Sequence, residues 1–154
     1  MGVMSERHPL KVSYCTTCKG RLHHLKQTLP QNLLAESNNV NVEFVILDYG
    51  SEDGMSDWMK QTYWSEIISG RIRYARYESK FFRMAHAKNM AHRLSTGDVL
   101  CNLDADNVLG ANFSTWLARI FSFNRHTIST VPSQRVSAWD YVAESRAIRM
   151  MQGL

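Results

Sequence analysis

Four β-prone runs alternate with four helical patterns along this chain, and this alternation limits the folds that it can adopt. The runs are residues 11–14, 42–47, 72–77 and 99–103. The strongest is residues 42–47, Val-Glu-Phe-Val-Ile-Leu, because β-branched and aromatic residues in an unbroken run are typical of a strand buried on both faces. Strands that alternate with helices predict an α/β fold: a mostly parallel sheet with helices on both faces, in a three-layer sandwich.

Apolar side chains recur at helical spacing after each strand. The expected helices are residues 22–29, 55–67, 87–94 and 113–120. Pro30 is expected to close the first helix, because a proline interrupts the backbone hydrogen bonds of a helix. We expect Ser51 or Asp53 to cap the second helix and Gly70 to end it, and we expect Gly97 to end the third.

The length and composition favour one domain that spans residues 1–154, since 154 residues that are 44% apolar can bury a sizeable core. No stretch approaches the roughly 18 uninterrupted apolar residues of a membrane span. The three cysteines suit a reducing compartment, so we expect a cytoplasmic protein. Beyond residue 125 the pattern weakens, with a fifth strand expected at 127–131 and a helix at 136–151.

The net charge of +4 is unevenly distributed. From Gly110 onward there are five arginines and two acidic residues. Such a surface could meet lipid headgroups or nucleic acid, but solubilising charge on helix faces is the favoured interpretation. The chain contains no nucleic-acid-binding motif, so nucleic acid is not expected as a partner.

Polar residues follow three of the predicted strands, at the points where the strands end. They are Thr16 and Thr17, then Asp48 and Tyr49, then residues 104–106, Asp-Ala-Asp. In a parallel α/β sheet, ligands bind outside the carboxyl ends of the strands. Two carboxylates there can hold Mg²⁺ or Mn²⁺ and leave positions for phosphate oxygens. The alternative is that both aspartates only stabilise the turn that follows the strand.

A Cys-x-x-Cys motif at Cys15 and Cys18 offers a competing interpretation, because a strand, this motif and a helix also describe a thioredoxin-like redox site. No strand and helix precede the motif, and Pro132 lies too far along the chain to be its neighbouring cis-proline. Zinc would need two further ligands, and Cys101 offers only one. Both thiols are therefore expected to fill space at the end of the first strand.

Several motifs in register resemble the inverting glycosyltransferases of family 2. They are Leu-Asp-Tyr-Gly-Ser-Glu-Asp-Gly at 47–54, Ala-His-Ala-Lys-Asn-Met-Ala at 85–91, Thr-Gly-Asp-Val-Leu at 96–100 and Asn-Leu-Asp-Ala-Asp-Asn at 102–107. The resemblance covers residues 11–124 and implies a Rossmann-like GT-A fold that binds a nucleotide-diphosphate sugar. Residues 125–154 match nothing in the family's second half, so we expect a tail that is divergent or truncated.

The resemblance also implies roles for individual residues. Thr16 and Thr17 match positions that contact the nucleoside, and Asp48 matches the acid that accepts a hydrogen bond from the base. Tyr49 departs from the second Asp that is usual in the family, and it could stack on the base instead. Arg83 matches a basic residue that approaches the base or the phosphates.

For the metal, Asp104 matches the first acid of the family's DxD motif, near the ribose and the metal. Asp106 matches the second acid, the usual direct ligand of Mn²⁺ or Mg²⁺. Arg21, Lys80 and Lys88 are further cations in this part of the sequence, with weaker claims to the phosphates than Arg83.

The expected activity is transfer of a sugar to an acceptor hydroxyl with inversion, from a UDP-sugar in preference to other donors. Asp140 is the local candidate for the general base, with Glu144 on the same helix face, although pairing with Arg146 or solvation of the helix is the favoured interpretation of both acids. One alternative is a nucleotide-sugar-binding module without catalysis, because only 47 residues follow Asn107 (154 minus 107). Another is a nucleotidyltransferase, for which Lys19-Gly20-Arg21 is a thin phosphate loop. A homodimer through the C-terminal segment is also expected, and the sequence identifies no acceptor.

Overall fold

The computed structural model describes residues 9–123, which contain four strands and five helices. The strands are β1 (Val12–Cys18), β2 (Val42–Asp48), β3 (Ile72–Arg76) and β4 (Val99–Asn102). The helices are α1 (Leu22–Ala35), α2 (Met55–Thr62), α3 (Trp64–Ile68), α4 (Met84–Leu94) and α5 (Phe113–Phe123). All neighbouring strands are parallel, in the order β3-β2-β1-β4. The predicted α/β fold with a parallel sheet is confirmed.

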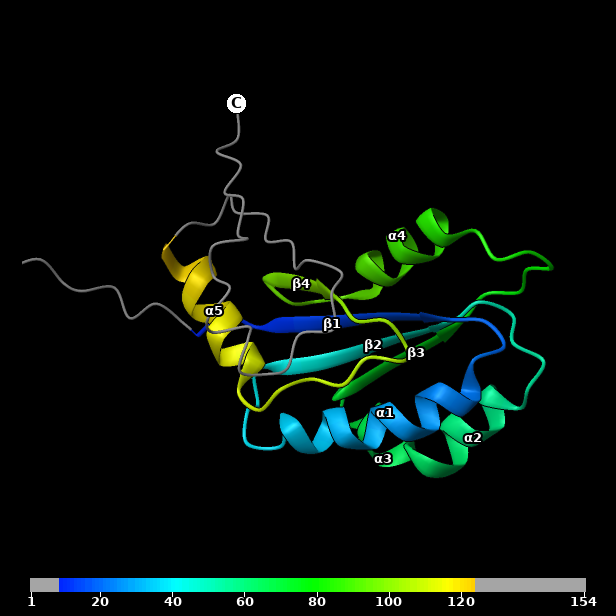
Figure 1. The fold of residues 1–154 in the computed structure, drawn as a ribbon, viewed down its shortest axis with the longest axis horizontal. Coiled ribbons are helices and arrows are strands. Elements are labelled where there is room, and N and C mark those ends of the chain that lie inside the picture. Colours follow the sequence, from blue (N-terminus) through cyan, green and yellow to red (C-terminus); the bar gives the residue numbers. More distant parts are fainter. Residues whose placement is uncertain (1–8, 124–154) are drawn as a thin grey trace, which may run out of the picture.

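Helices cover both faces of this sheet (Figure 1). Helices α1, α2 and α3 lie on one face, α4 lies on the other, and α5 lies near one end of the sheet. Successive residues of β2 serve the two layers in turn, as the alternation of a strand requires. Phe44 and Ile46 belong to the core with α1 and α2, while Val45 and Leu47 pack with Ala87 of α4. The three layers are therefore built on a central strand that is buried along its whole length.

The first strand is longer than the sequence predicts. Thr16 and Thr17 lie within β1, where the sequence predicts a loop, because β1 pairs with β2 as far as Cys18 and Asp48. Cys15 and Cys18 pack in different core clusters, on opposite faces of the sheet, so their sulfurs do not face each other. Burial raises the pKa of each thiol to about 12. This geometry supports the space-filling role over the redox site.

Helix α1 does not end at Pro30, contrary to the prediction. It continues to Ala35 with Pro30 inside it. Pro30 is exposed, so water can solvate the carbonyl that its missing N–H leaves free. Asn32 and Glu36, at the end of the helix, are buried and hydrogen-bonded to distant segments. Tertiary contacts thus outweigh the local cost of the proline.

Three predicted helix boundaries are also wrong. The second helix is interrupted at Tyr63, between α2 and α3. Gly54 precedes α2 in the left-handed conformation, in place of a Ser51 or Asp53 cap. Gly97 does not end α4, whose C-cap is Ser95. A Cβ on Gly97 would lie 2.4 Å from the Ser13 hydroxyl, so this glycine permits close contact with β1. The expected end of the second helical segment at Gly70, with a φ of 78°, is confirmed.

No helix within residues 9–123 is long and apolar enough to cross a membrane. The fifth strand expected at 127–131 and the helix expected at 136–151 lie outside the described residues, as do Asp140 and the segment proposed for dimerisation.

Candidate functional site

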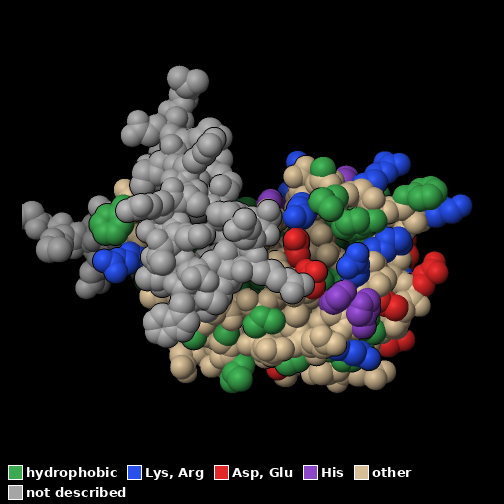
Figure 2. Space-filling model, viewed as in Figure 1, with side chains coloured by type: hydrophobic (Ala, Val, Ile, Leu, Met, Phe, Trp, Pro, Cys, Tyr) green, Lys and Arg blue, Asp and Glu red, His purple; other side chains and the backbone are tan. Residues whose placement is uncertain are grey.

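A cavity of about 490 Å³ opens at the carboxyl ends of β1 and β4. Its lining comes from segments far apart in the sequence: the end of β1, the start of α1, the segment before α4, α4 itself and the loop after β4. The lining residues are Thr17, Lys19, Arg21, His24, Phe82, Met84, Lys88, Asp104, Ala105 and Asp106. Figure 2 shows Lys and Arg side chains gathered on the same face of the molecule as Asp, Glu and His side chains. The cavity thus has the position that the sequence predicts for a ligand site.

The loop after β4 presents its two aspartates by burying the residues beside them. Leu103 and Ala105 are buried, whereas Asp104 and Asp106 are exposed. The Leu103 amide donates to the Cys15 carbonyl at 3.0 Å, and the hydroxyl of buried Thr16 donates to the Leu103 carbonyl at 2.7 Å. Both carboxylates therefore project from a loop that is fixed to β1.

Helix α1 holds the same loop from the other side. The Thr28 hydroxyl donates to the Ala105 carbonyl at 2.7 Å. The Asn32 side-chain amide donates to the Asn107 carbonyl at 3.0 Å and accepts from the Leu109 amide at 2.7 Å. A loop held at several backbone groups can position ligands accurately, because little ordering remains to be done on binding.

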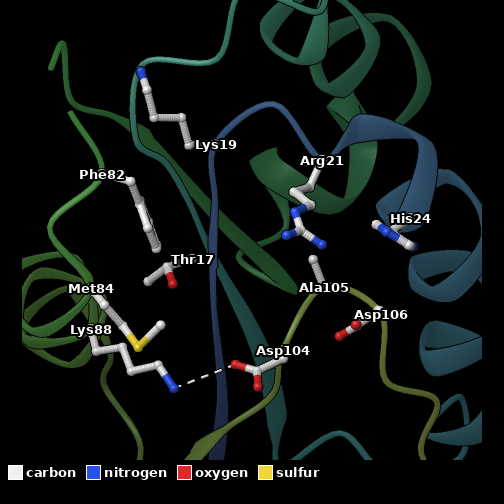
Figure 3. Close-up of a pocket in the computed structure, with 10 residues that line it drawn as sticks. All are labelled: Thr17, Lys19, Arg21, His24, Phe82, Met84, Lys88, Asp104, Ala105 and Asp106. Atoms are coloured by element: carbon white, nitrogen blue, oxygen red, sulfur yellow. Dashed lines mark hydrogen bonds and ion pairs between the residues drawn. The ribbon is translucent and has the colours of Figure 1, made fainter. Parts of the chain in front are cut away.

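The cations of the cavity differ in their freedom to meet a ligand (Figure 3). Lys88 on α4 pairs with Asp104, with 3.4 Å between Nζ and Oδ1. Arg21, just before α1, points its guanidinium toward the space beside Ala105. Lys19 points away from Asp104 and donates to the carbonyls of Gly50 and Ser79, each at 2.6 Å. Arg21 is thus available to an anion, Lys88 becomes available when it leaves Asp104, and Lys19 joins two loops.

The loop after β2 braces the loop after β1. The Ser51 hydroxyl accepts from the Gly20 amide at 3.0 Å, and the Asp53 carboxylate accepts from the Leu22 amide at 2.9 Å. The two residues expected to cap the second helix therefore hold the start of α1, next to Arg21. This fixes the backbone from which Arg21 reaches the cavity.

Asp48 does not line the cavity and is fully buried at the end of β2. Its Oδ1 accepts from the Ser51 amide at 2.8 Å, and its Oδ2 accepts from Arg76 at 2.6 Å and from the Tyr74 hydroxyl at 3.1 Å. Burial raises the pKa of Tyr74 to about 12, so this hydroxyl remains protonated and able to donate. The carboxylate accepts three hydrogen bonds within the protein and is fully buried, so a contact with a nucleobase would require the residues that cover it to move.

Tyr49 is also buried, in an aromatic cluster behind the cavity wall. Its hydroxyl lies 2.8 Å from His86 Nδ1, and its ring packs against those of Tyr77 and Phe82, with centroids 5.1 and 5.6 Å away. Tyr49 therefore supports Phe82, which does line the cavity.

The predicted site residues thus fall into three groups. Thr17, Asp104 and Asp106 line one cavity. Thr16, Asp48 and Tyr49 are buried behind it. Arg83 directly precedes α4, is exposed and is not among the residues that line the cavity.

His24, Phe82 and Met84 line the cavity without having been singled out from the sequence. The signal that could have found them is position: His24 lies in the first turn of the helix after β1, and Phe82 and Met84 lie where α4 begins. Residues that start the helix after a parallel strand face the carboxyl edge of the sheet.

A divalent metal fits the donor set that the cavity offers. No group of three or more His, Cys, Asp or Glu side chains suited to a metal occurs within the described part of the chain. Mg²⁺ is typically held by one or two carboxylates together with substrate phosphates, rather than by a cage of protein ligands. Two exposed carboxylates beside a space for an anion match that pattern.

Comparison with protein families matches residues 13–150 to the family described as Glycosyl transferase family 2. Comparison with curated protein sequences gives no match. Among solved structures, the chain is similar to the mannosyltransferase PcManGT from Pyrobaculum calidifontis in complex with GDP-Man and Mn²⁺. The identity is 21% and the TM-score 0.61, over 87% of this chain and 39% of that one.

The chain is also similar to S. aureus TarS residues 1–349 in complex with UDP, at 15% identity and a TM-score of 0.62. That match covers 82% of this chain and 38% of the other. These likenesses establish the fold. The chain spans about two fifths of the length of the solved structures that it matches.

Proposed function

Since this chain belongs to glycosyltransferase family 2, we propose that the cavity beside Asp104 and Asp106 binds the diphosphate of a nucleotide sugar through Mn²⁺ or Mg²⁺. One observation carries the proposal: Thr17, Asp104, Asp106, Lys88 and Arg21, from four separate segments, line a single cavity. Its volume of about 490 Å³ lies within the range of small-molecule sites, roughly 300–1,000 Å³.

Asp104 and Asp106 would both hold the metal through their carboxylate oxygens, and Asp106, which matches the usual direct ligand of the family, would contribute most. When bound, the metal neutralises charge on the diphosphate leaving group. Lys88 and Arg21 add positive charge toward the phosphates. Thr17 lies where the nucleoside would approach, and Thr16 positions the metal-binding loop through its bond to Leu103.

The reaction that follows is a direct displacement with inversion. The acceptor oxygen forms a bond to the anomeric carbon, the bond from that carbon to the diphosphate breaks, and the nucleoside diphosphate leaves with the electron pair. A carboxylate takes the acceptor proton. Asp140 remains our candidate for this base, and a UDP-sugar remains our preferred donor.

A nucleotide-sugar-binding module without catalysis is the second candidate. The observation that favours it is that, among the described residues that line the cavity, the carboxylates are Asp104 and Asp106, and the proposal gives both of them to the metal. An acceptor groove and a base must both be within reach of the bound donor for transfer to occur. Sugar transfer by the isolated chain, abolished by Asp140→Asn, would decide for the enzyme.

Titration of the protein with UDP and GDP, each with Mn²⁺ and with a chelator, tests the binding site. We expect UDP to bind more tightly with Mn²⁺, and Asp106→Asn to remove most of that difference. Asp57→Asn is the matched control, because Asp57 is exposed on α2 and outside the cavity lining. Equal affinity with and without Mn²⁺ in the unmodified protein would refute the metal site.

A further inference from the structure

We propose that the Lys88–Asp104 ion pair couples the binding of metal and nucleotide in this cavity. In the free protein the Lys88 ammonium pairs with the Asp104 carboxylate, and it therefore competes with a divalent cation for that carboxylate. When the donor binds, the ammonium turns to the diphosphate. This proposal rests on the proposed function, since it assigns Lys88 a role toward the same two ligands.

The pair is loose enough to exchange partners. The 3.4 Å between Lys88 Nζ and Asp104 Oδ1 exceeds the roughly 2.7–2.9 Å of a strong charge-assisted hydrogen bond. The Asp104 side chain is 63% exposed and that of Lys88 is 30% exposed. Water therefore weakens the attraction, and neither group depends on the other for burial.

The backbone on each side of the pair is fixed. Ala87 and Ala91, which flank Lys88 on α4, are fully buried against the sheet. The loop that carries Asp104 is fixed through Leu103 and Ala105. Only the flexible stem of Lys88 has to move, so its ammonium can leave Asp104 without a change in the fold.

The two carboxylates of the Asp-Ala-Asp motif differ in their ion pairing. Within residues 9–123, Asp104 has an ion pair and Asp106 has none. A cation that binds both must displace Lys88 from Asp104, whereas binding at Asp106 alone displaces nothing. Lys88 thus opposes the metal at Asp104 in particular.

The consequence is cooperativity between the two ligands. A metal that binds both carboxylates must break the pair, and so must a diphosphate that attracts Lys88. When both bind, the pair is broken once, so each ligand facilitates the binding of the other. Such coupling is reciprocal, because each ligand must change the affinity of the other by the same factor.

Lys88→Gln tests the proposal by removing the ammonium and keeping a side chain of similar reach. An exposed ion pair contributes about 0.2–1 kcal/mol, which corresponds to roughly a 1.4- to fivefold change in an equilibrium constant. We expect the factor by which Mn²⁺ tightens nucleotide binding to fall by that ratio in Lys88→Gln. The measurement is calorimetry with UDP or GDP, whichever binds the unmodified protein more tightly, with Mn²⁺ and with a chelator.

A second readout needs no nucleotide. Electron paramagnetic resonance of Mn²⁺ should show tighter binding of the ion alone to Lys88→Gln than to the unmodified protein. Nucleotide in chelator should bind Lys88→Gln about tenfold more weakly, because a charge-assisted contact to the phosphates is lost. Lys88→Arg should restore that affinity.

Arg93→Gln is the matched control, since it removes one positive charge from the exposed surface of α4 outside the cavity lining. Arg93→Gln should change neither the Mn²⁺ enhancement of nucleotide binding nor the affinity for Mn²⁺ alone. If Lys88→Gln keeps the Mn²⁺ enhancement of the unmodified protein, or does not bind Mn²⁺ alone more tightly, the coupling role is refuted. If the unmodified protein shows no Mn²⁺ enhancement at all, the proposed function fails first.

Discussion

Asp48→Asn separates two roles that the same carboxylate could have. The resemblance to the family gives Asp48 a contact with the nucleobase. In the structure it accepts hydrogen bonds from Ser51, Tyr74 and Arg76, and it has no exposed surface. The substitution keeps the size of the side chain but removes its charge. The side-chain NH₂ group of asparagine cannot accept a hydrogen bond, so at least one of the three donors loses its acceptor.

The expected loss of stability follows from these bonds. A hydrogen bond to a charged group contributes about 1.5–3 kcal/mol, and a neutral one about 0.5–1.5 kcal/mol. Arg76 remains paired with Glu78, at 2.5 Å, so its charge is not stranded, and its side chain is 29% exposed. We therefore expect Asp48→Asn to lower the free energy of unfolding by about 2–3 kcal/mol, below the 3–5 kcal/mol typical of a broken buried pair.

Urea unfolding at pH 7, followed by tryptophan fluorescence, measures this loss. Tyr74→Phe is the matched control, because it removes one neutral donor to the same oxygen and should cost about 1 kcal/mol. UDP affinity is then measured below the unfolding transition of each variant. If the carboxylate only braces the end of β2, the folded variants should bind UDP within about threefold of the unmodified protein.

The opposite pattern would refute this reasoning. Suppose that Asp48→Asn unfolds within about 0.5 kcal/mol of the unmodified protein yet binds UDP more than tenfold more weakly. The carboxylate would then act on the ligand, and the residues that bury it would have to move on binding. In that case the family role of Asp48 would stand.

Three further predictions concern stability and thiol chemistry. Burial alone would raise the pKa of Glu43, but hydrogen bonds from Lys11, Thr96 and Ser13 outweigh it and lower the pKa from 4.5 to about 2. The Glu43 carboxylate should stabilise the fold by about 3 kcal/mol above pH 4.5, and this contribution should be lost as the pH falls through 2. Urea unfolding of Glu43→Gln at several pH values checks this, since the difference in free energy of unfolding between the variant and the unmodified protein should shrink in acid. Gly97→Ala should lower the melting temperature more than Gly20→Ala, because a Cβ at Gly97 clashes with β1, whereas a Cβ at Gly20 meets no atom and costs only the strain of its φ of 64°. Equal losses in a thermal scan would contradict this. Cys15 and Cys18 should react with a thiol reagent at pH 8 only after urea unfolding, because burial raises both pKa values to about 12; rapid labelling of either in the folded protein would contradict this.

The sequence predicted the order and type of the elements, because periodicity is a local property. An unbroken β-prone run such as residues 42–47 predicts a strand that is covered on both faces of the sheet, and β2 is buried throughout. Leu25 and Leu29 could be assigned to the core for the same reason. Helix boundaries were less predictable, since α1 continues past Pro30 through contacts with distant segments and the second helix is interrupted at Tyr63.

The site was predictable in part. The aspartates of residues 104–106 follow a strand, and the carboxyl ends of parallel strands meet at one edge, so sequence alone put them beside Thr17. The sequence could not show which polar residues at that edge face the cavity and which face the interior of the protein. Asp48 faces inward because Arg76 and Tyr74, on the neighbouring strand β3, supply donors for it.

The sequence by itself therefore determined three things: the layered architecture, the order of the strands and helices along the chain, and the position of two carboxylates after the fourth strand. All three follow from local sequence patterns. Only the tertiary structure decided which charges meet. Lys88 and Asp104 are 16 residues apart, on α4 and after β4, and no pattern in the sequence relates them. They meet because the small side chains of Ala87 and Ala91 let α4 pack closely on the sheet, and such a packing distance depends on both surfaces at once.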